Sequence, residues 1–243
     1  DPIVTGQATR VEIGIYWKLY KAPVEVTGLM IEEAKASGGQ FADILNEELR
    51  VAVEDMTYSM NSDLFSTGSE AAAGGAVAGL KRLIDDGDNY STLYGVTRTG
   101  TDWSSATTCE TAEALSLARM RTMIYTVQQA GAKKENLVFL TSFKQETAFR
   151  NLCQELQIAT PTTSAFGFTG VMSLDGVPII PDQNCDAGYL YLLDVSTFRV
   201  YVLLTPTMKP LPSQKDAEAA FVRTYLEVVC LHPYKNYKHT ALT

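Results

Sequence analysis

A long apolar stripe between residues 41 and 65 constrains this chain more than any other feature. Apolar residues recur there every three or four positions: Phe41, Leu45, Leu49, Ala52, Met56, Met60 and Leu64. This spacing places them on one face of an α-helix, away from the acidic residues of the segment. Such a helix is about 36 Å long, roughly twice the usual length in globular proteins. It is either the core helix of an ordinary α/β domain or a beam along an elongated subunit.

The segment before this helix has the two-residue period of a β-strand. One face is predicted to carry Val11, Ile13, Ile15, Trp17 and Leu19, and the other Glu12, Gly14, Tyr16, Lys18 and Tyr20. Ala22-Pro23 is expected to interrupt the strand, which resumes at residues 24–26 and predicts a two-stranded ribbon. An isolated ribbon is only marginally stable in water, so this one must pair with later strands or rest on another molecule.

We favour contact with another molecule, because both faces of the ribbon carry large side chains. The predicted intersubunit contacts are Tyr16, Trp17, Lys18, Tyr20 and Lys21.

Composition limits the classes of protein that fit. The 243 residues are 46% hydrophobic and 20% charged, which is typical of a globular chain with a real core. No apolar run approaches the roughly 18 residues that cross a bilayer, so no membrane partner is expected. The net charge of −8 disfavours a basic nucleic-acid groove, although a protein that only encloses nucleic acid needs none.

The cysteines predict the compartment in which the chain folds, and the first residue bears on how the chain was processed. The four cysteines are far apart and form no CxxC pair, which predicts buried thiols in a reducing compartment: Cys109, Cys153, Cys185 and Cys230. The sequence starts at Asp1, so the chain has been processed or begins inside a longer one.

Residues 107–205 carry the mixture of helices and strands that is typical of an α/β unit. Thr107-x-x-Glu110 is a capping box, predicted to open a helix that ends at Gly131. The apolar run 136–140 predicts a strand buried on both faces, and Ser142-x-x-Gln145 predicts a second capped helix. Asp175-Gly176 between two apolar runs predicts a tight hairpin.

The end of the chain predicts a return to the long helix. Strands are expected at 189–193 and 198–204, followed by a stiff linker that contains Pro206, Pro210 and Pro212. A final strand is predicted at 221–230. The long helix and this last strand are expected to belong together, so that one domain is inserted into another.

No constellation of catalytic residues is present in the sequence. The two histidines, His232 and His239, lie near the C-terminus, and packing is the expected role of Cys230 beside His232. The sequence lacks GxSxG, HExxH, P-loop and GxGxxG motifs. Asp182, Asp186 and Asp194 fall in separate turns or strand ends. We therefore predict no enzyme, with no catalytic, cofactor-binding or metal-binding residues and no cofactor.

The order of parts resembles the major capsid protein of tailed double-stranded-DNA viruses, with the Hong Kong 97-type fold that encapsulin shells share. The local pieces that carry the resemblance are a strand-to-helix step at 136–142, a Gly-Val-Pro-hydrophobic hairpin at 168–182 and the strand at 189–194. The resemblance implies an α+β fold with an extended β-ribbon arm, a long spine helix, a peripheral domain and an inserted α/β axial domain.

The resemblance also implies a role for each part of the chain. Residues 1–36 would form the N-terminal arm and extended ribbon, which lies over a neighbour. Residues 37–106 would form the peripheral domain with the spine helix, 107–205 the axial domain, and 206–243 the return to the peripheral domain.

The implied partners are those of a virion shell assembled in the host cytoplasm. They are further copies of the chain in hexamers and pentamers, portal, scaffold or cement proteins, and packaged double-stranded DNA bound without sequence specificity. Two alternatives stay open. One is an encapsulin-type nanocompartment, and the other is a cytoplasmic α/β enzyme with carboxylates such as Asp182 and Asp186 at its site.

Overall fold

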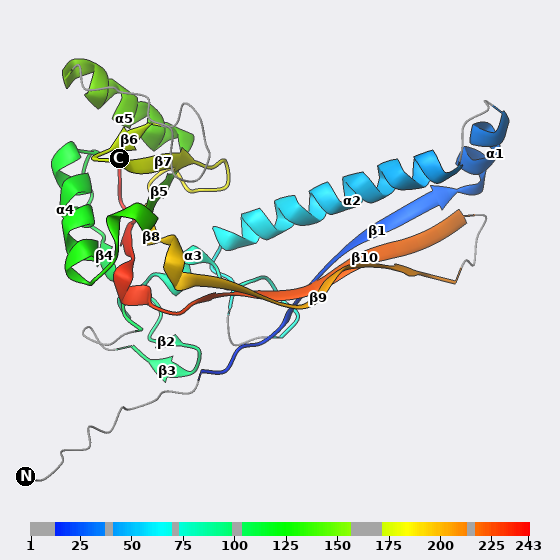
Figure 1. Cartoon of the computed structure of the whole chain (residues 1–243), viewed down its shortest axis with the longest axis horizontal. Helices are drawn as coiled ribbons and strands as arrows, with labels where there is room; N and C mark the ends of the chain where they lie inside the picture. The colour runs from blue at the N-terminus through cyan, green and yellow to red at the C-terminus, as the bar shows by residue number, and fades with distance from the viewer. Residues whose placement is uncertain (1–12, 37–40, 70–72, 99–103, 157–171, 213–216) are drawn as a thin grey trace, which may run out of the picture.

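The chain folds into an elongated α+β molecule with a compact end and a long extension (Figure 1). The computed structural model describes residues 13–36, 41–69, 73–98, 104–156, 172–212 and 217–243. The extension combines a three-stranded sheet, in the order β1-β10-β9, with the helices α1 and α2. The compact end holds a six-stranded sheet, in the order β4-β11-β8-β5-β7-β6.

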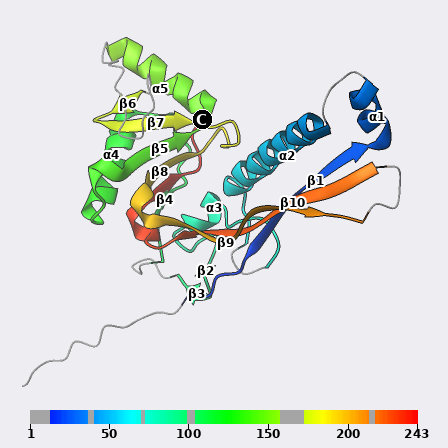
Figure 2. The same cartoon turned by 45° about the vertical axis from the view of Figure 1, so that its right-hand side comes forward.

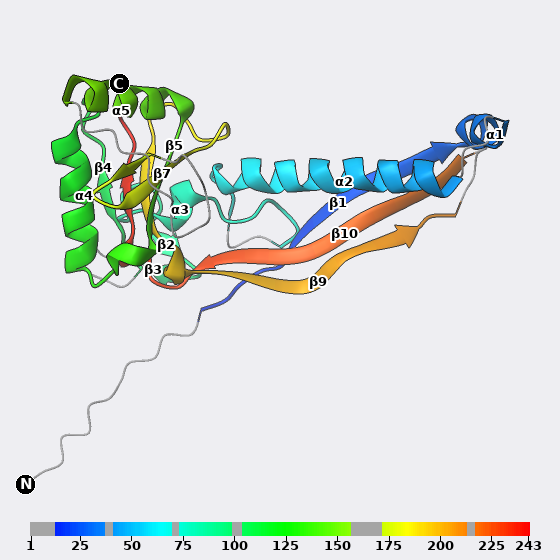
Figure 3. The ribbon, with the colours of Figure 1, turned by 45° about the horizontal axis from the view of Figure 1, so that its top comes forward.

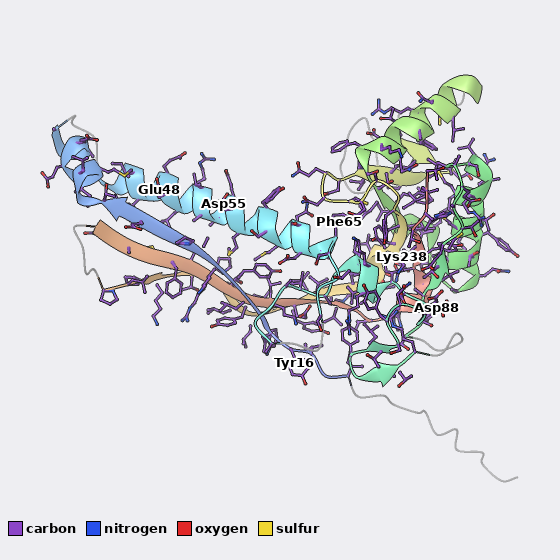
Figure 4. The ribbon with its side chains drawn as sticks, turned by 180° about the vertical axis from the view of Figure 1, so that it is seen from behind. Tyr16, Glu48, Asp55, Phe65, Asp88 and Lys238 are labelled. Carbon is purple, nitrogen blue, oxygen red and sulfur yellow. The ribbon has the colours of Figure 1, made fainter. Side chains whose placement is uncertain are left out.

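Helix α2 (Phe41–Leu64) is the beam of the extension, and it lies along the three-stranded sheet (Figure 3). Its apolar residues contact one face of that sheet, as the stripe predicts: Leu45, Leu49, Ala52, Met56 and Met60 pack with Tyr20, Val24, Ala220 and Val222. Leu64 joins the core of the compact end, whereas the side chain of Phe41 lies outside the described residues. On its outer surface α2 carries exposed carboxylates such as Asp55 (Figure 4).

Strand β1 (Lys18–Thr27) corrects the expectation that the ribbon rests on another molecule. It pairs antiparallel over its whole length with β10 (Ala217–Cys230), from Lys18 opposite Leu226 to Thr27 opposite Ala217. The expected break at Ala22-Pro23 is also wrong. Because β1 is an edge strand, a proline without an N–H group is tolerated in it, and Pro23 is exposed.

The expected proline linker is a strand as well. Strand β9 (Phe198–Pro210) continues through Pro206, and Leu211 N still donates to Ala219 O at 2.8 Å. The register with β10 shifts twice between Val202 and Thr207, so β9 holds two extra residues there. An edge strand with bulges accommodates prolines that a central strand would exclude.

The six-stranded sheet separates two cores. Its strands are β4 (Thr107–Cys109), β5 (Leu137–Thr141), β6 (Ser173–Leu174), β7 (Val177–Pro181), β8 (Leu190–Asp194) and β11 (Tyr237–His239). Leu137 and Phe139 pack beneath α4 (Leu117–Gln129) and α5 (Phe143–Leu156), while Val138 faces the opposite core. The prediction that this run is buried on both faces is confirmed. Figure 2 shows α4 and α5 on the side of the sheet away from α2.

The second core joins the compact end to the extension. It contains α3 (Leu80–Leu83), the short hairpin of β2 (Thr92–Leu93) and β3 (Val96–Thr97), and Val229 and Cys230 of β10. Lys238 of β11 reaches into this region, where its Nζ lies 2.9 Å from Asp85 Oδ2 and both side chains are buried (Figure 4).

The two predicted capping boxes have different outcomes. Ser142 caps α5, since its Oγ accepts from Gln145 N at 3.4 Å. Thr107 does not open a helix, because residues 107–109 form β4 and pair in parallel with β11. Helix α4 instead begins after Ser116, whose Oγ accepts from Arg119 N at 3.2 Å. A partner strand near the C-terminus thus overrides the local signal.

Two further expectations concern the hairpin and the cysteines. The hairpin β6–β7 is confirmed, with φ of 51° at Asp175 and 84° at Gly176, the left-handed conformation that a tight hairpin turn requires. All four cysteines are free thiols, and three are buried while Cys109 is partly exposed. In the part of the chain that the structure describes, no helix is long and apolar enough to span a membrane.

A buried ion pair fixes β1 against β10. Lys18 Nζ lies 3.6 Å from Glu227 Oε2, and neither side chain is more than 1% exposed. Lys18 Nζ also donates to Ser69 O, and Glu227 Oε1 accepts from Ala78 N and Val228 N, each at 3.1 Å. Burial raises the pKa of the Glu227 carboxyl, and the hydrogen bonds and the charge of Lys18 offset this rise only in part.

Removing the cation of this pair is expected to destabilise the subunit in a pH-dependent way. Lys18→Met leaves the Glu227 carboxylate buried without a counter-charge, which costs about 3–5 kcal/mol. Because the folded-state pKa of Glu227 lies above its unfolded value, protonation at low pH relieves this cost. The stability deficit, measured by urea unfolding of the unassembled subunit, should therefore be larger near pH 8 than near pH 5.

Lys21→Met is the matched control, because Lys21 is exposed on the same strand. Its effect should stay within about 0.5 kcal/mol. Equal losses for the two variants, or a deficit for Lys18→Met that does not change with pH, would contradict the assignment.

Candidate assembly surfaces

The five residues predicted to contact a neighbour divide into two groups. Lys18 and Tyr20 face the chain's own core, Lys18 through its ion pair with Glu227. Tyr20 Oη donates to Asp63 Oδ2 at 2.7 Å and accepts from Val77 N at 3.0 Å. Burial, followed by the bond to Asp63, raises the pKa of the Tyr20 hydroxyl. These two side chains hold β1 in place and are not available at the surface.

The other three residues remain accessible. Tyr16 is 49% exposed and lies just before β1, at the edge of the molecule (Figure 4). Lys21 is exposed and Trp17 is half-buried, while the Trp17 carbonyl accepts from Gly74 N at 3.0 Å. Within β1, Lys18 and Tyr20 share the face that meets α2 and the loop before α3, whereas Lys21 points to the opposite face. Tyr16 precedes the strand, so its exposure does not follow from the alternation.

Two exposed apolar surfaces were not predicted from the sequence. Strand β9 exposes Val200 by 61%, Val202 by 49% and Leu203 by 59%. Helix α1 (Gly28–Ala36), at the tip of the extension, exposes Leu29 by 68%. Clusters of this kind mark sites of protein–protein contact. The strand pattern of residues 198–204 was the available signal, but it could not reveal that α2 leaves this strand uncovered.

The carboxylates that could suggest a hydrolase have separate structural roles. Asp182 accepts from Asn61 Nδ2 at 3.0 Å and from Asn184 N at 2.8 Å, which ties α2 to the loop after β7. Asp186 pairs with Lys81. Asp194 accepts from Ser196 N at 3.0 Å at the start of a short 3₁₀ turn.

One group of side chains has the right atoms for a metal. Ligand atoms of Cys109, Glu113 and His239 lie within 4.8 Å of one another. However, His239 Nε2 is already 2.9 Å from Glu113 Oε1, and Arg119 binds the same carboxylate through two nitrogens. Arg119 and then His239 lower the pKa of the Glu113 carboxyl to about 2. A guanidinium in this position makes the group an ion-pair network between α4 and β11.

The other cysteine–histidine pair does not form a site. Burial raises the pKa of the Cys230 thiol to about 12, and Cys230 Sγ lies 3.5 Å from Asn236 Nδ2. His232 is exposed. Packing is the role of Cys230, as its position on the strand indicates.

Comparisons with known proteins agree with this architecture. A family model, described as the SU10 major capsid protein, matches residues 3–243. A search of curated proteins finds no match.

Solved structures show the same fold at low sequence identity. A subunit of the cyanophage A-1(L) capsid is 17% identical with a TM-score of 0.71, over 93% of this chain and 77% of that one. The SrpI encapsulin of Synechococcus elongatus PCC 7942 is 18% identical with a TM-score of 0.64, over 93% and 74%. The capsid of Mycobacterium phage Che8 is 12% identical with a TM-score of 0.57, over 92% and 71%.

The family match covers nearly the whole chain, and the fold is that of capsid subunits. The chain therefore belongs to the SU10 major capsid protein family: it is a non-enzymatic structural protein of the virion shell, with the Hong Kong 97-type capsid fold.

Proposed function

We propose that this major capsid protein assembles, as hexamers and pentamers, into an icosahedral head shell that encloses the double-stranded DNA of a tailed virus. The observation that carries the proposal is the match of 93% of the chain to a cyanophage capsid subunit, with the elongated extension and the compact end included. Assembly takes place in the host cytoplasm, and portal, scaffold or cement proteins are further partners.

The proposed domains have the predicted residue ranges, and only the role of the arm changes. Residues 107–205 form the axial domain, and residues 37–106 and 206–243 form the peripheral domain. Within residues 1–36, β1 belongs to the subunit's own sheet. Contacts of the arm with a neighbour therefore involve the accessible side chains, Tyr16, Trp17 and Lys21.

Two physical features support a shell that is held by many weak contacts. A subunit bound on several sides gains from effective concentration, so each contact can be weak and reversible during assembly. The net charge of −8 keeps packaged DNA from adhering to the protein, in line with enclosure without sequence-specific binding.

An encapsulin-type compartment is the second candidate, because the SrpI encapsulin shares the fold at a TM-score of 0.64. The two functions differ in what the shell contains and in how it is sealed. A virion head carries DNA and one vertex for a tail, whereas a nanocompartment is a closed cage around cargo protein.

Electron microscopy of particles formed by the full chain tests the proposal. We expect closed icosahedral shells, and heads purified from infected cells should hold nuclease-protected double-stranded DNA and one tail vertex. A chain that stays monomeric at high concentration by light scattering, even with scaffold protein present, would overturn the proposal. Small closed cages with protein inside would favour the encapsulin candidate.

If the arm contacts a neighbour, removing its exposed side chains should raise the protein concentration that is needed for assembly. The double variant Tyr16→Ala/Lys21→Ala should fold normally, because both side chains are exposed, but should raise this concentration roughly tenfold, equivalent to about 1.4 kcal/mol per subunit. Light scattering and circular dichroism provide the two measurements.

Tyr125→Ala/Lys133→Ala is the matched control, with an exposed tyrosine and an exposed lysine on and after α4. The arm assignment fails if both double variants shift assembly by the same amount, or if neither does.

A further inference from the structure

The three-stranded sheet has a second face, on the side away from α2. Val222 of β10 packs in the core beneath α2. The alternation of the strand therefore places Phe221, Arg223 and Tyr225 on the opposite face. Figure 3 shows α2 along one side of the sheet, and no helix of the described residues runs along the other side. These three residues of β10, with the residues that face them on β1 and β9, are here called the open sheet face.

Three cations meet on the open sheet face. Lys21 of β1 lies directly opposite Arg223. Lys209 of β9 lies directly opposite Phe221, one diagonal step from Arg223. Residues directly opposite one another project to the same face with their Cβ atoms about 5 Å apart, and diagonal neighbours are about 7–8 Å apart. Like charges at directly opposite positions destabilise a sheet, so this arrangement favours the arrival of a negative charge.

The subunit itself does not supply that charge. Among the described residues, none of the three cations forms an ion pair with a carboxylate, and Nε of Arg223 is buried without a hydrogen-bond partner. The Cζ atom of Arg223 instead lies 6.0 Å from the ring centres of Phe221 and Tyr225. Glu25, the acidic residue of β1, lies further along the strand, opposite Ala219. The positive charge of the cluster is therefore uncompensated in the single subunit.

The side chains around these cations fit a protein partner better than a nucleic acid. Arginine and aromatic residues are enriched where proteins bind one another. A guanidinium can hold a carboxylate through two parallel hydrogen bonds. DNA-binding surfaces neutralise many phosphates with Lys and Arg, whereas this cluster has three cations on a chain with a net charge of −8. The chemistry of the site therefore favours carboxylates on a protein segment.

The acidic surface of α2 in another copy is not a suitable partner. This surface exposes Glu47, Glu54 and Asp55, and Arg50 already pairs with the first two. It lies on the other side of the sheet from Arg223, so its contact with the open sheet face of the next copy would stack subunits through their thickness. Repetition of such a contact gives a pile of subunits and not a closed layer. The partner that fits is a different protein.

We propose that the open sheet face binds an acidic segment of an accessory protein, with carboxylates of that segment paired to Arg223 and Lys209. The proposal rests on the proposed shell function and deepens it, because it names the surface and the charge by which a scaffold or cement protein attaches to the subunit. Lys21 adds to the positive potential of the site from the neighbouring strand.

Fluorescence anisotropy with a short labelled peptide of alternating glutamate and serine tests the site on unassembled subunits in a low-salt buffer. The double variant Arg223→Gln/Lys209→Gln should weaken binding roughly tenfold or more, while Arg223→Lys, which keeps the charge, should retain most of it. A peptide with glutamine in place of glutamate should not bind. Circular dichroism checks that each variant is folded. Lys21 stays unchanged, because it belongs to the proposed arm contact.

The matched control is Lys134→Gln/Lys144→Gln, which removes two charges from exposed positions of the compact end. Equal weakening by the two double variants, or no binding of the glutamate peptide to the wild-type chain, would overturn the docking proposal. A short DNA duplex that competes for Arg223 and Lys209 and binds more tightly than the peptide would also overturn it, in favour of a nucleic-acid surface.

Particle formation, followed separately by light scattering, distinguishes this proposal from the shell function. Wild-type chains that form shells but do not bind the peptide would overturn the docking proposal and leave the shell function standing. Peptide binding that depends on Arg223 and Lys209, in a chain that forms no particles, would support the site and overturn the shell function alone.

Discussion

The structure depends on the pairing of β1 with β10, which joins residues 18–27 to residues 217–230. This pairing creates the sheet that α2 needs beneath its apolar stripe, and without it Ala52 and Met56 would face water. The buried Lys18–Glu227 pair fixes the register, because a slip by one residue would move a charge to a face that has no partner for it. The extension of the subunit is therefore a property of the single chain, present before any neighbour arrives.

The same geometry explains why the subunit is incomplete by itself. One helix covers β1 and β10 but not β9, so part of the sheet face stays apolar and open. Prolines keep the edge of β9 from pairing with another strand, which leaves the face as the surface for contact. In a shell protein such an opening is useful, since a weak contact of moderate area can form, break and re-form until the shell closes.

Features encoded within one segment were predictable from the sequence. The stripe of α2, the cap at Ser142 and the turn at Asp175-Gly176 depend on neighbours a few residues away, and all three are present. Features that depend on distant partners were not. Thr107 has the local pattern of a helix cap but pairs with β11, and Pro206 lies in a strand because β10 runs beside it.

The residues predicted to contact a neighbour also depend on parts of the chain that lie far away in the sequence. The sequence shows the alternation of residues 16–21 but does not say which face meets the subunit's own core. Lys18 and Tyr20, which the sequence predicts to contact a neighbour, therefore bind Glu227 and Asp63 of their own chain instead. The exposure of Val200 depends on where α2 lies on the sheet, which no local pattern records.

Hydrogen–deuterium exchange, measured on unassembled subunits and on closed particles, tests the central claim most directly. Amides of β1 and β10 should exchange slowly in both states, because their pairing precedes assembly, whereas amides of α1 and β9 should gain protection only in particles. Fast exchange of the β1 amides in folded, unassembled subunits, with protection that appears only in the particle, would contradict the account. It would indicate that β1 pairs with a neighbouring molecule and not with β10 of its own chain.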